Sequence, residues 1–131
     1  MQTNITPCLM FQGKAEEALS FYIAHIPNSK MLGIERYGPD ESGAEGSVNT
    51  AMASLDGLVV RCLDSPVQLK FTFTPSLSLF KTCASQEEIK SLSDLFADGG
   101  EVLMPLDNYG FGQNFTWVND RFGVSWQLLF P

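Results

Sequence analysis

The stretch FQGKAEEALSFY at residues 11–22 has a counterpart later in the chain, CASQEEIKSLSDLF at residues 83–96. Each segment follows an apolar run and has the pattern of an amphipathic helix. The first turn of each predicted helix contains two glutamates, and the helix dipole favours negative charge at this end. A second pair, LDGLVVRCL at 55–63 and NDRFGVSWQLL at 119–129, places a tight Asp-to-Gly turn before an apolar strand. The chain therefore repeats one half-size module.

The spacing of apolar residues and turn residues predicts the same order in both halves, which is strand, helix and three strands. We expect one domain at residues 1–131, with modules at 1–65 and 76–131 joined by a proline-containing stretch. Ser85 and Glu88 form the S-x-x-E pattern of a capping box at the start of the second helix. The expected strands are 5–11, 31–37, 48–55, 58–63, 76–83, 102–106, 114–118 and 124–130, with helices between Gly13 and Pro27 and between Ser85 and Gly99.

One helix covers only one face of a four-stranded sheet. The other face is expected to meet the second module, either side by side within the chain or across a dimer. Two curved sheets of this kind enclose a cup, and ligands favour concave sites. The expected fold class is therefore α+β, with two βαβββ modules forming a curved mixed sheet around a cup.

The charge balance narrows the expected partners. The chain has 8 basic and 15 acidic residues, a net charge of −7 and no run of Lys or Arg, so neither nucleic acid nor a membrane surface is expected to bind. No apolar run reaches the roughly 20 residues of a membrane helix, and no basic region precedes the first strand, so we expect a cytoplasmic protein. Cys8, Cys62 and Cys83 are expected to be reduced, buried thiols.

Three segments carry a family resemblance: ITPCLMFQGKAEEALSFY at 5–22, PNSKMLGIERYG at 27–38 and DRFGVSWQLLFP at 120–131. Together with the repeat, they resemble the PhnB-like branch of the glyoxalase/bleomycin-resistance/dioxygenase superfamily, also called vicinal oxygen chelate proteins. The third segment is the most specific of the three. The resemblance spans essentially the whole chain and implies the fold described above, a small-molecule ligand and a homodimer.

Members of this branch often carry the label 3-demethylubiquinone-9 3-methyltransferase. Such an activity needs a site for S-adenosylmethionine, normally a Gly-rich turn between a strand and a helix of a larger α/β domain. The sequence has no such turn, and 131 residues cannot hold that domain beside this fold. We therefore expect no methyltransferase activity.

Enzymes of the superfamily place metal ligands on the first and last strands of each module, and the resemblance maps the last-strand position onto Gln127. Aligning Gly57 with Gly123 pairs Arg61 with Gln127, so both side chains are expected to face the cup. The matching positions on the first and fifth strands are Thr6 or Cys8, Met10, and Ser76 or Ser78.

This set predicts no metal cofactor, because divalent sites need several carboxylate or imidazole ligands and Arg61 carries a permanent positive charge. The only histidine, His25, falls at the end of the first helix. A guanidinium in an apolar cup would instead bind an organic anion through two hydrogen bonds. In the alternative, Arg61 pairs with an internal acid such as Glu35 or Asp64, or lies outside at a dimer edge.

Two further features complete the expected site. The apolar neighbours of Cys8 favour an inert, buried thiol over a nucleophile. Tyr109 and Phe111 are flanked by Gly110 and Gly112, so they are suited to a lid over the cup, with plain loop packing or a dimer contact as alternatives.

The expected substrate-binding residues are Thr6, Cys8, Arg61, Ser78, Tyr109, Phe111 and Gln127. The sequence identifies no catalytic residue. The favoured function is metal-free binding of a small organic molecule, for which Arg61 indicates an anion. The alternatives are a metal-dependent glyoxalase- or dioxygenase-type enzyme, and an interaction module whose cup is filled by its own side chains.

Overall fold

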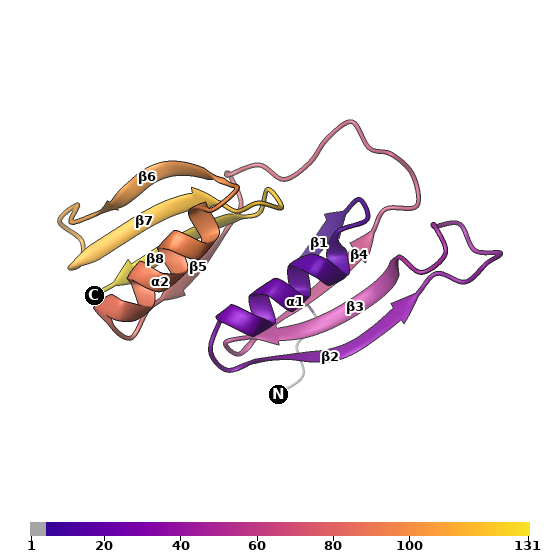
Figure 1. Ribbon diagram of the computed structural model, residues 1–131, viewed down its shortest axis with the longest axis horizontal. Helices are drawn as coiled ribbons and strands as arrows, with labels where there is room; N and C mark the ends of the chain where they lie inside the picture. Colours follow the sequence, from indigo (N-terminus) through magenta and orange to yellow (C-terminus); the bar gives the residue numbers. More distant parts are fainter. Residues whose placement is uncertain (1–4) are drawn as a thin grey trace. The chain divides into compact units, whose positions relative to one another are not determined.

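The computed structural model describes residues 5–131. The chain divides into two compact units, with the boundary between Thr72 and Phe73. Both units have the order strand, helix and three strands, so the predicted repeat is confirmed (Figure 1). In the described part of the chain, neither helix has the length and apolar character needed to cross a membrane.

Unit 1 contains one helix and a four-stranded mixed sheet in the order β1-β4-β3-β2. Its parallel pair is β1 with β4, whereas β3 pairs antiparallel with both β2 and β4. The elements are β1 (Cys8–Phe11), α1 (Ala15–His25), β2 (Ser29–Arg36), β3 (Val48–Leu55) and β4 (Leu58–Asp64).

Unit 2 repeats this topology with the order β5-β8-β7-β6, in which β5 and β8 are parallel. Figure 1 shows that each helix lies over one face of its own sheet. The elements are β5 (Ser78–Thr82), α2 (Gln86–Ala97), β6 (Glu101–Asp107), β7 (Asn114–Asn119) and β8 (Ser125–Phe130).

The core of each unit lies between its helix and its sheet. In unit 1, α1 buries the predicted apolar face, including Leu19 and Tyr22, while the sheet buries Val60 and Cys62. In unit 2, Phe96 of α2 packs on Trp126 of β8 with ring centroids 4.8 Å apart. Trp126 therefore faces the helix.

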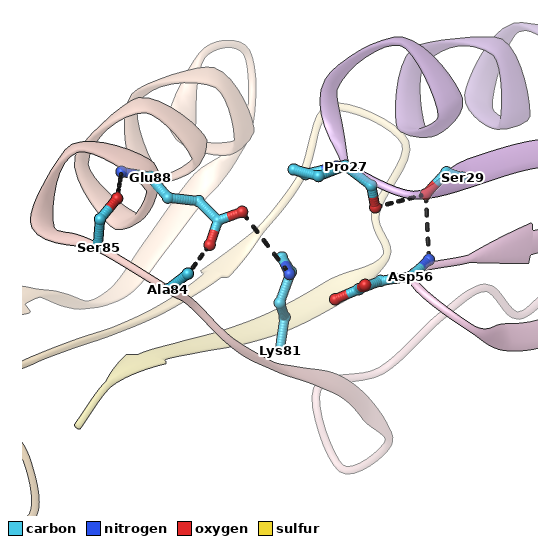
Figure 2. A network of polar contacts seen from close by, with 7 residues as sticks. All are labelled: Pro27, Ser29, Asp56, Lys81, Ala84, Ser85 and Glu88. Carbon is cyan, nitrogen blue, oxygen red and sulfur yellow. Dashed lines mark hydrogen bonds and ion pairs between the residues drawn. The ribbon is translucent and has the colours of Figure 1, made fainter.

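The turn chemistry follows the sequence closely. Asp56 and Gly57, which join β3 to β4, both have positive φ (49° and 93°), as a tight hairpin turn requires. Gly99 has φ 75° just after α2, a left-handed conformation that is common at helix ends and that glycine adopts without strain. Figure 2 shows Ser29 beside this hairpin, where its hydroxyl donates to Pro27 O and accepts from Asp56 N.

The two helices begin with different caps. Ser85 Oγ accepts from Glu88 N at 3.0 Å, and the Glu88 carboxylate accepts from Ala84 N at 2.6 Å and pairs with Lys81 (Figure 2). The predicted capping box is therefore present, with its return bond one residue earlier than usual. The residue before α1, Lys14, makes no side-chain cap.

Asp64 supplies the missing cap for α1. Its carboxylate accepts hydrogen bonds from Gly13 N at 2.8 Å, Ala15 N at 3.0 Å and Val48 N at 2.9 Å. The side chain is 3% exposed. Asp64 thus ties the end of β4 to the starts of α1 and β3, a role that its position beside the linker did not suggest.

Candidate functional site

The helix-free face of the unit 1 sheet carries several of the residues predicted for the site. Cys8 on β1 is the register partner of Arg61 on β4, which in turn is the partner of Met52 on β3. Their neighbours Leu9 and Cys62 are buried on the helix side, so strand alternation points Cys8 and Arg61 away from α1.

Arg61 is held in place by neutral groups on β3. Its Nη1 donates to Thr50 Oγ1 at 2.9 Å, and its Nη2 contacts Met52 Sδ at 3.7 Å. Neither carboxylate considered as an internal partner, Glu35 or Asp64, forms an ion pair with it in residues 5–72. Asp64 is occupied on the helix side, so within residues 5–72 the exposed Arg61 has no carboxylate that neutralises its charge.

An open hollow of about 190 Å³ lies beside the Arg61 side chain. The sequence did not predict its other walls. Gly33 forms part of the lining, and a Cβ placed there would meet nothing within 4 Å, so the missing side chain leaves space. The lining comprises residues 32–35 of β2, Thr50, Ala51 and Met52 of β3, and Arg61 of β4.

Cys8 is exposed, so the prediction that its thiol is buried is wrong. The cause is strand alternation, since Leu9 and Phe11 occupy the helix side of β1. Cys62 and Cys83 are buried, as predicted, and none of the three cysteines forms a disulfide. Burial, aided by Cys8 and Asp64, raises the pKa of the Cys62 thiol to about 12, which keeps it protonated and unreactive.

Thr6 and Ser76 lie outside the strands to which they were assigned. β1 begins at Cys8 and β5 begins at Ser78, both later than predicted. Thr6 is half-buried just before β1. The neighbouring Pro7 has no N–H to donate, and its carbonyl accepts from Arg61 N at 2.9 Å, which fixes the start of β1 against β4.

On unit 2, Gln127 holds the place that Arg61 holds on unit 1. Gln127 is the register partner of Phe80 on the parallel strand and of Trp117 on the antiparallel strand. Its Nε2 donates to Ser78 Oγ at 2.9 Å, so the structure brings together two of the predicted residues. The alignment of Gly57 with Gly123 therefore placed Arg61 and Gln127 at equivalent positions.

Tyr109 and Phe111 pack together on unit 2 rather than standing apart as a free loop. Their rings stack with centroids 6.1 Å apart, and Phe111 meets Phe115 of β7 edge-on at 4.9 Å. Tyr109 Oη donates to Pro105 O at 2.6 Å. The two aromatic side chains therefore pack on unit 2, and their role as a lid over a ligand stays a prediction.

A larger hollow, of about 380 Å³, lies between α2 and β6 of unit 2. Its two charged side chains, Lys90 and Asp94, already pair with each other at 2.7 Å, and Thr116 donates to Met104 O. With these groups satisfied, this hollow offers less to a polar ligand than the Arg61 hollow.

Comparison with solved structures first defines the class. FosX, a fosfomycin resistance protein from Listeria monocytogenes, superposes with a TM-score of 0.63 over 98% of this chain and 93% of its own, at 13% identity. At this identity the likeness shows the fold alone, which is that of the glyoxalase, or vicinal oxygen chelate, proteins such as FosX.

The family follows from closer matches. The model of the 3-demethylubiquinone-9 3-methyltransferase family matches residues 3–129, so the chain belongs to this PhnB-like family. A PhnB protein from Bacillus cereus with the same methyltransferase description is 45% identical, with 98% and 100% of the two chains covered and a TM-score of 0.95. PA1353 from Pseudomonas aeruginosa is 25% identical, with 98% and 97% covered and a TM-score of 0.84. Curated proteins yield no match.

The family description is not supported by the architecture. Each unit of the described chain has a mixed sheet with a single parallel pair. A nucleotide-type cofactor such as S-adenosylmethionine normally binds at the strand ends of a mostly parallel sheet, at a Gly-rich turn. Residues 5–131 contain no Gly-rich turn that leads from a strand of a mostly parallel sheet into a helix.

The donor atoms present do not fit a divalent metal either. The positions where the superfamily resemblance implies ligands carry Thr6 or Cys8, Met10, Arg61, Ser76 or Ser78, and Gln127. They supply hydroxyls, a thiol, a thioether, an amide and a cation, where imidazoles and carboxylates are needed. Within residues 5–131, no group of three or more His, Cys, Asp or Glu side chains is arranged to hold a metal ion.

Proposed function

We propose that the protein binds a small organic anion at Arg61, without a divalent metal. The observation that carries this proposal is an exposed guanidinium that has no ion-pairing carboxylate in unit 1 and borders an open hollow. The bond to Thr50 orients the guanidinium and leaves other N–H groups free for a carboxylate, phosphate or phosphonate.

The test is isothermal titration calorimetry, in which butyrate or methylphosphonate is titrated into wild type and into Arg61→Gln and the dissociation constants are compared. Gln removes the charge and keeps a polar side chain, so we expect binding to weaken about tenfold, the scale of one charge-assisted hydrogen bond. Arg36→Gln is the matched control. Arg36 does not line the hollow, and its guanidinium forms an ion pair with Glu16 at an N–O distance of 2.6 Å. Equal affinities of wild type and Arg61→Gln would refute the proposal.

The metal-free part has its own measurement. We expect plasma mass spectrometry of untagged protein, dialysed without chelator, to find less than stoichiometric metal. Anion binding should then be unchanged by a chelator. A stoichiometric metal whose removal abolishes binding would favour the metal-dependent enzyme instead.

We also propose that the protein is a homodimer, as the family resemblance implies. The support is that α1 and α2 each cover only one face of their own sheet. Light scattering on a sizing column should give twice the 14.4 kDa mass of one chain. A single-chain mass over the working concentration range would contradict this.

A further inference from the structure

We propose that the ligand of the Arg61 hollow is a small zwitterion, whose anionic group binds Arg61 and whose ammonium group binds Glu35. This inference rests on the proposed function, since it requires an anion site at Arg61. It gives Glu35 a role as a ligand contact, whereas the sequence predicted Glu35 only as a possible ion-pair partner of Arg61.

The position of Glu35 follows from the register of β2. Ile34 pairs with Ala51, which is buried on the helix side, and Glu35 pairs with Thr50. Alternation therefore directs Glu35 to the helix-free face. Thr50 is also the residue that receives the Arg61 hydrogen bond, so the two charged side chains approach the hollow from opposite sides of Thr50.

Both charges are unneutralised within unit 1. Among residues 5–72, Glu35 and Arg61 take part in no ion pair, although other charged groups of the same unit do, such as Arg36 with Glu16 at 2.6 Å. Arg61 and Glu35 border one hollow and do not pair with each other. They therefore suit a ligand that has one negative group for Arg61 and one positive group for Glu35. An anion alone would leave Glu35 beside a second negative charge, which costs affinity.

The size of the hollow limits the ligand. Its volume of about 190 Å³ is below the roughly 300 Å³ at which pockets for drug-sized molecules begin. Neighbouring strands lie about 4.8 Å apart, so the backbones of β2 and β4 are separated by about 10 Å across β3. A short aliphatic chain between amine and acid, over the apolar surface of Met52, matches this geometry.

The experiment compares three probes of similar length, which are 4-aminobutyrate, butyrate and butylamine. We expect wild type to prefer 4-aminobutyrate to butyrate by about fivefold, the upper range for an exposed ion pair. Glu35→Gln should remove this preference while butyrate binding is kept or improved. Glu45→Gln, at another exposed glutamate that lies outside the hollow lining, is the control of equal charge and should keep the preference.

The outcomes separate the two proposals. If wild type binds butyrate and 4-aminobutyrate equally, or if Glu35→Gln keeps the preference, the zwitterion is wrong while the anion site stands. If Arg61→Gln binds butyrate as wild type does, the anion site is wrong and the zwitterion fails with it. Failure of wild type to bind either acid overturns both. Since Glu35 is exposed, unchanged unfolding curves should accompany its substitution.

Discussion

The two units share one topology but start their helices in different ways. The start of α2 is capped by Ser85 and Glu88, which are neighbours in the chain. The start of α1 is capped by Asp64, which lies 49 to 51 residues away along the sequence. The comparison shows that a repeated fold fixes where a helix end must be satisfied, but not which residue satisfies it.

Asp64→Ala should produce the largest loss of stability. It would leave three backbone N–H groups without their acceptor in a buried setting, which we expect to cost about 3–4 kcal/mol. Urea unfolding followed by circular dichroism measures the change. Asp40→Ala, in the exposed loop before β3, is the control and should change stability little.

Thiol labelling should show whether this loss is confined to unit 1. Cys62 and Cys83 are buried in units 1 and 2, and the raised pKa of Cys62, about 12, keeps its thiol protonated at pH 8. We expect Asp64→Ala to speed the labelling of Cys62 by about 100-fold or more through local opening. Equal acceleration at Cys83, read by mass spectrometry, would mean that the units open together.

Asp120→Ala tests the corresponding buried carboxylate of unit 2, whose hydrogen bonds are local in sequence. Asp120 accepts hydrogen bonds from Phe122 N, Val124 N and Trp126 Nε1, all within six residues. We expect a loss of about 2–3 kcal/mol, since the hairpin turn can still form without the carboxylate. If Asp120→Ala costs more than Asp64→Ala in the same urea assay, sequence distance is not what sets the cost.

Ser85→Ala should have the smallest effect. Replacing a serine at the N-cap by alanine costs about 1 kcal/mol, and here the second cap bond, from Ala84 N to Glu88, is retained. The midpoint of urea unfolding should therefore shift only slightly. A loss comparable to that of Asp64→Ala would remove the distinction between local and long-range caps.

The sequence predicted those features whose signals are local. The Asp56–Gly57 turn and the Ser85 capping box each lie within a few residues, and both are present. The family resemblance and the Gly-to-Gly alignment placed Arg61 and Gln127 at matching positions in their sheets.

The features that it missed depend on pairing between distant segments. Nothing near Asp64 in the sequence indicates that its carboxylate will meet the start of α1. Glu35 follows an irregularity in the β2–β3 register between Met31 and Gly33, and a shift of one residue reverses the face of a side chain. Cys8 was assigned to the interior because its neighbours are apolar, although alternation with Leu9 places it outside.

The long-range cap of α1 also has a consequence for biosynthesis. Asp64 is made 49 residues after Ala15, which at about 5–20 residues per second is a delay of about 2–10 s. During this interval the nascent α1 lacks its acceptor, whereas α2 has its whole cap once Glu88 has been made. The start of α1 therefore cannot be capped until β4 has been synthesised. The start of α2 can be capped as soon as the helix emerges from the ribosome.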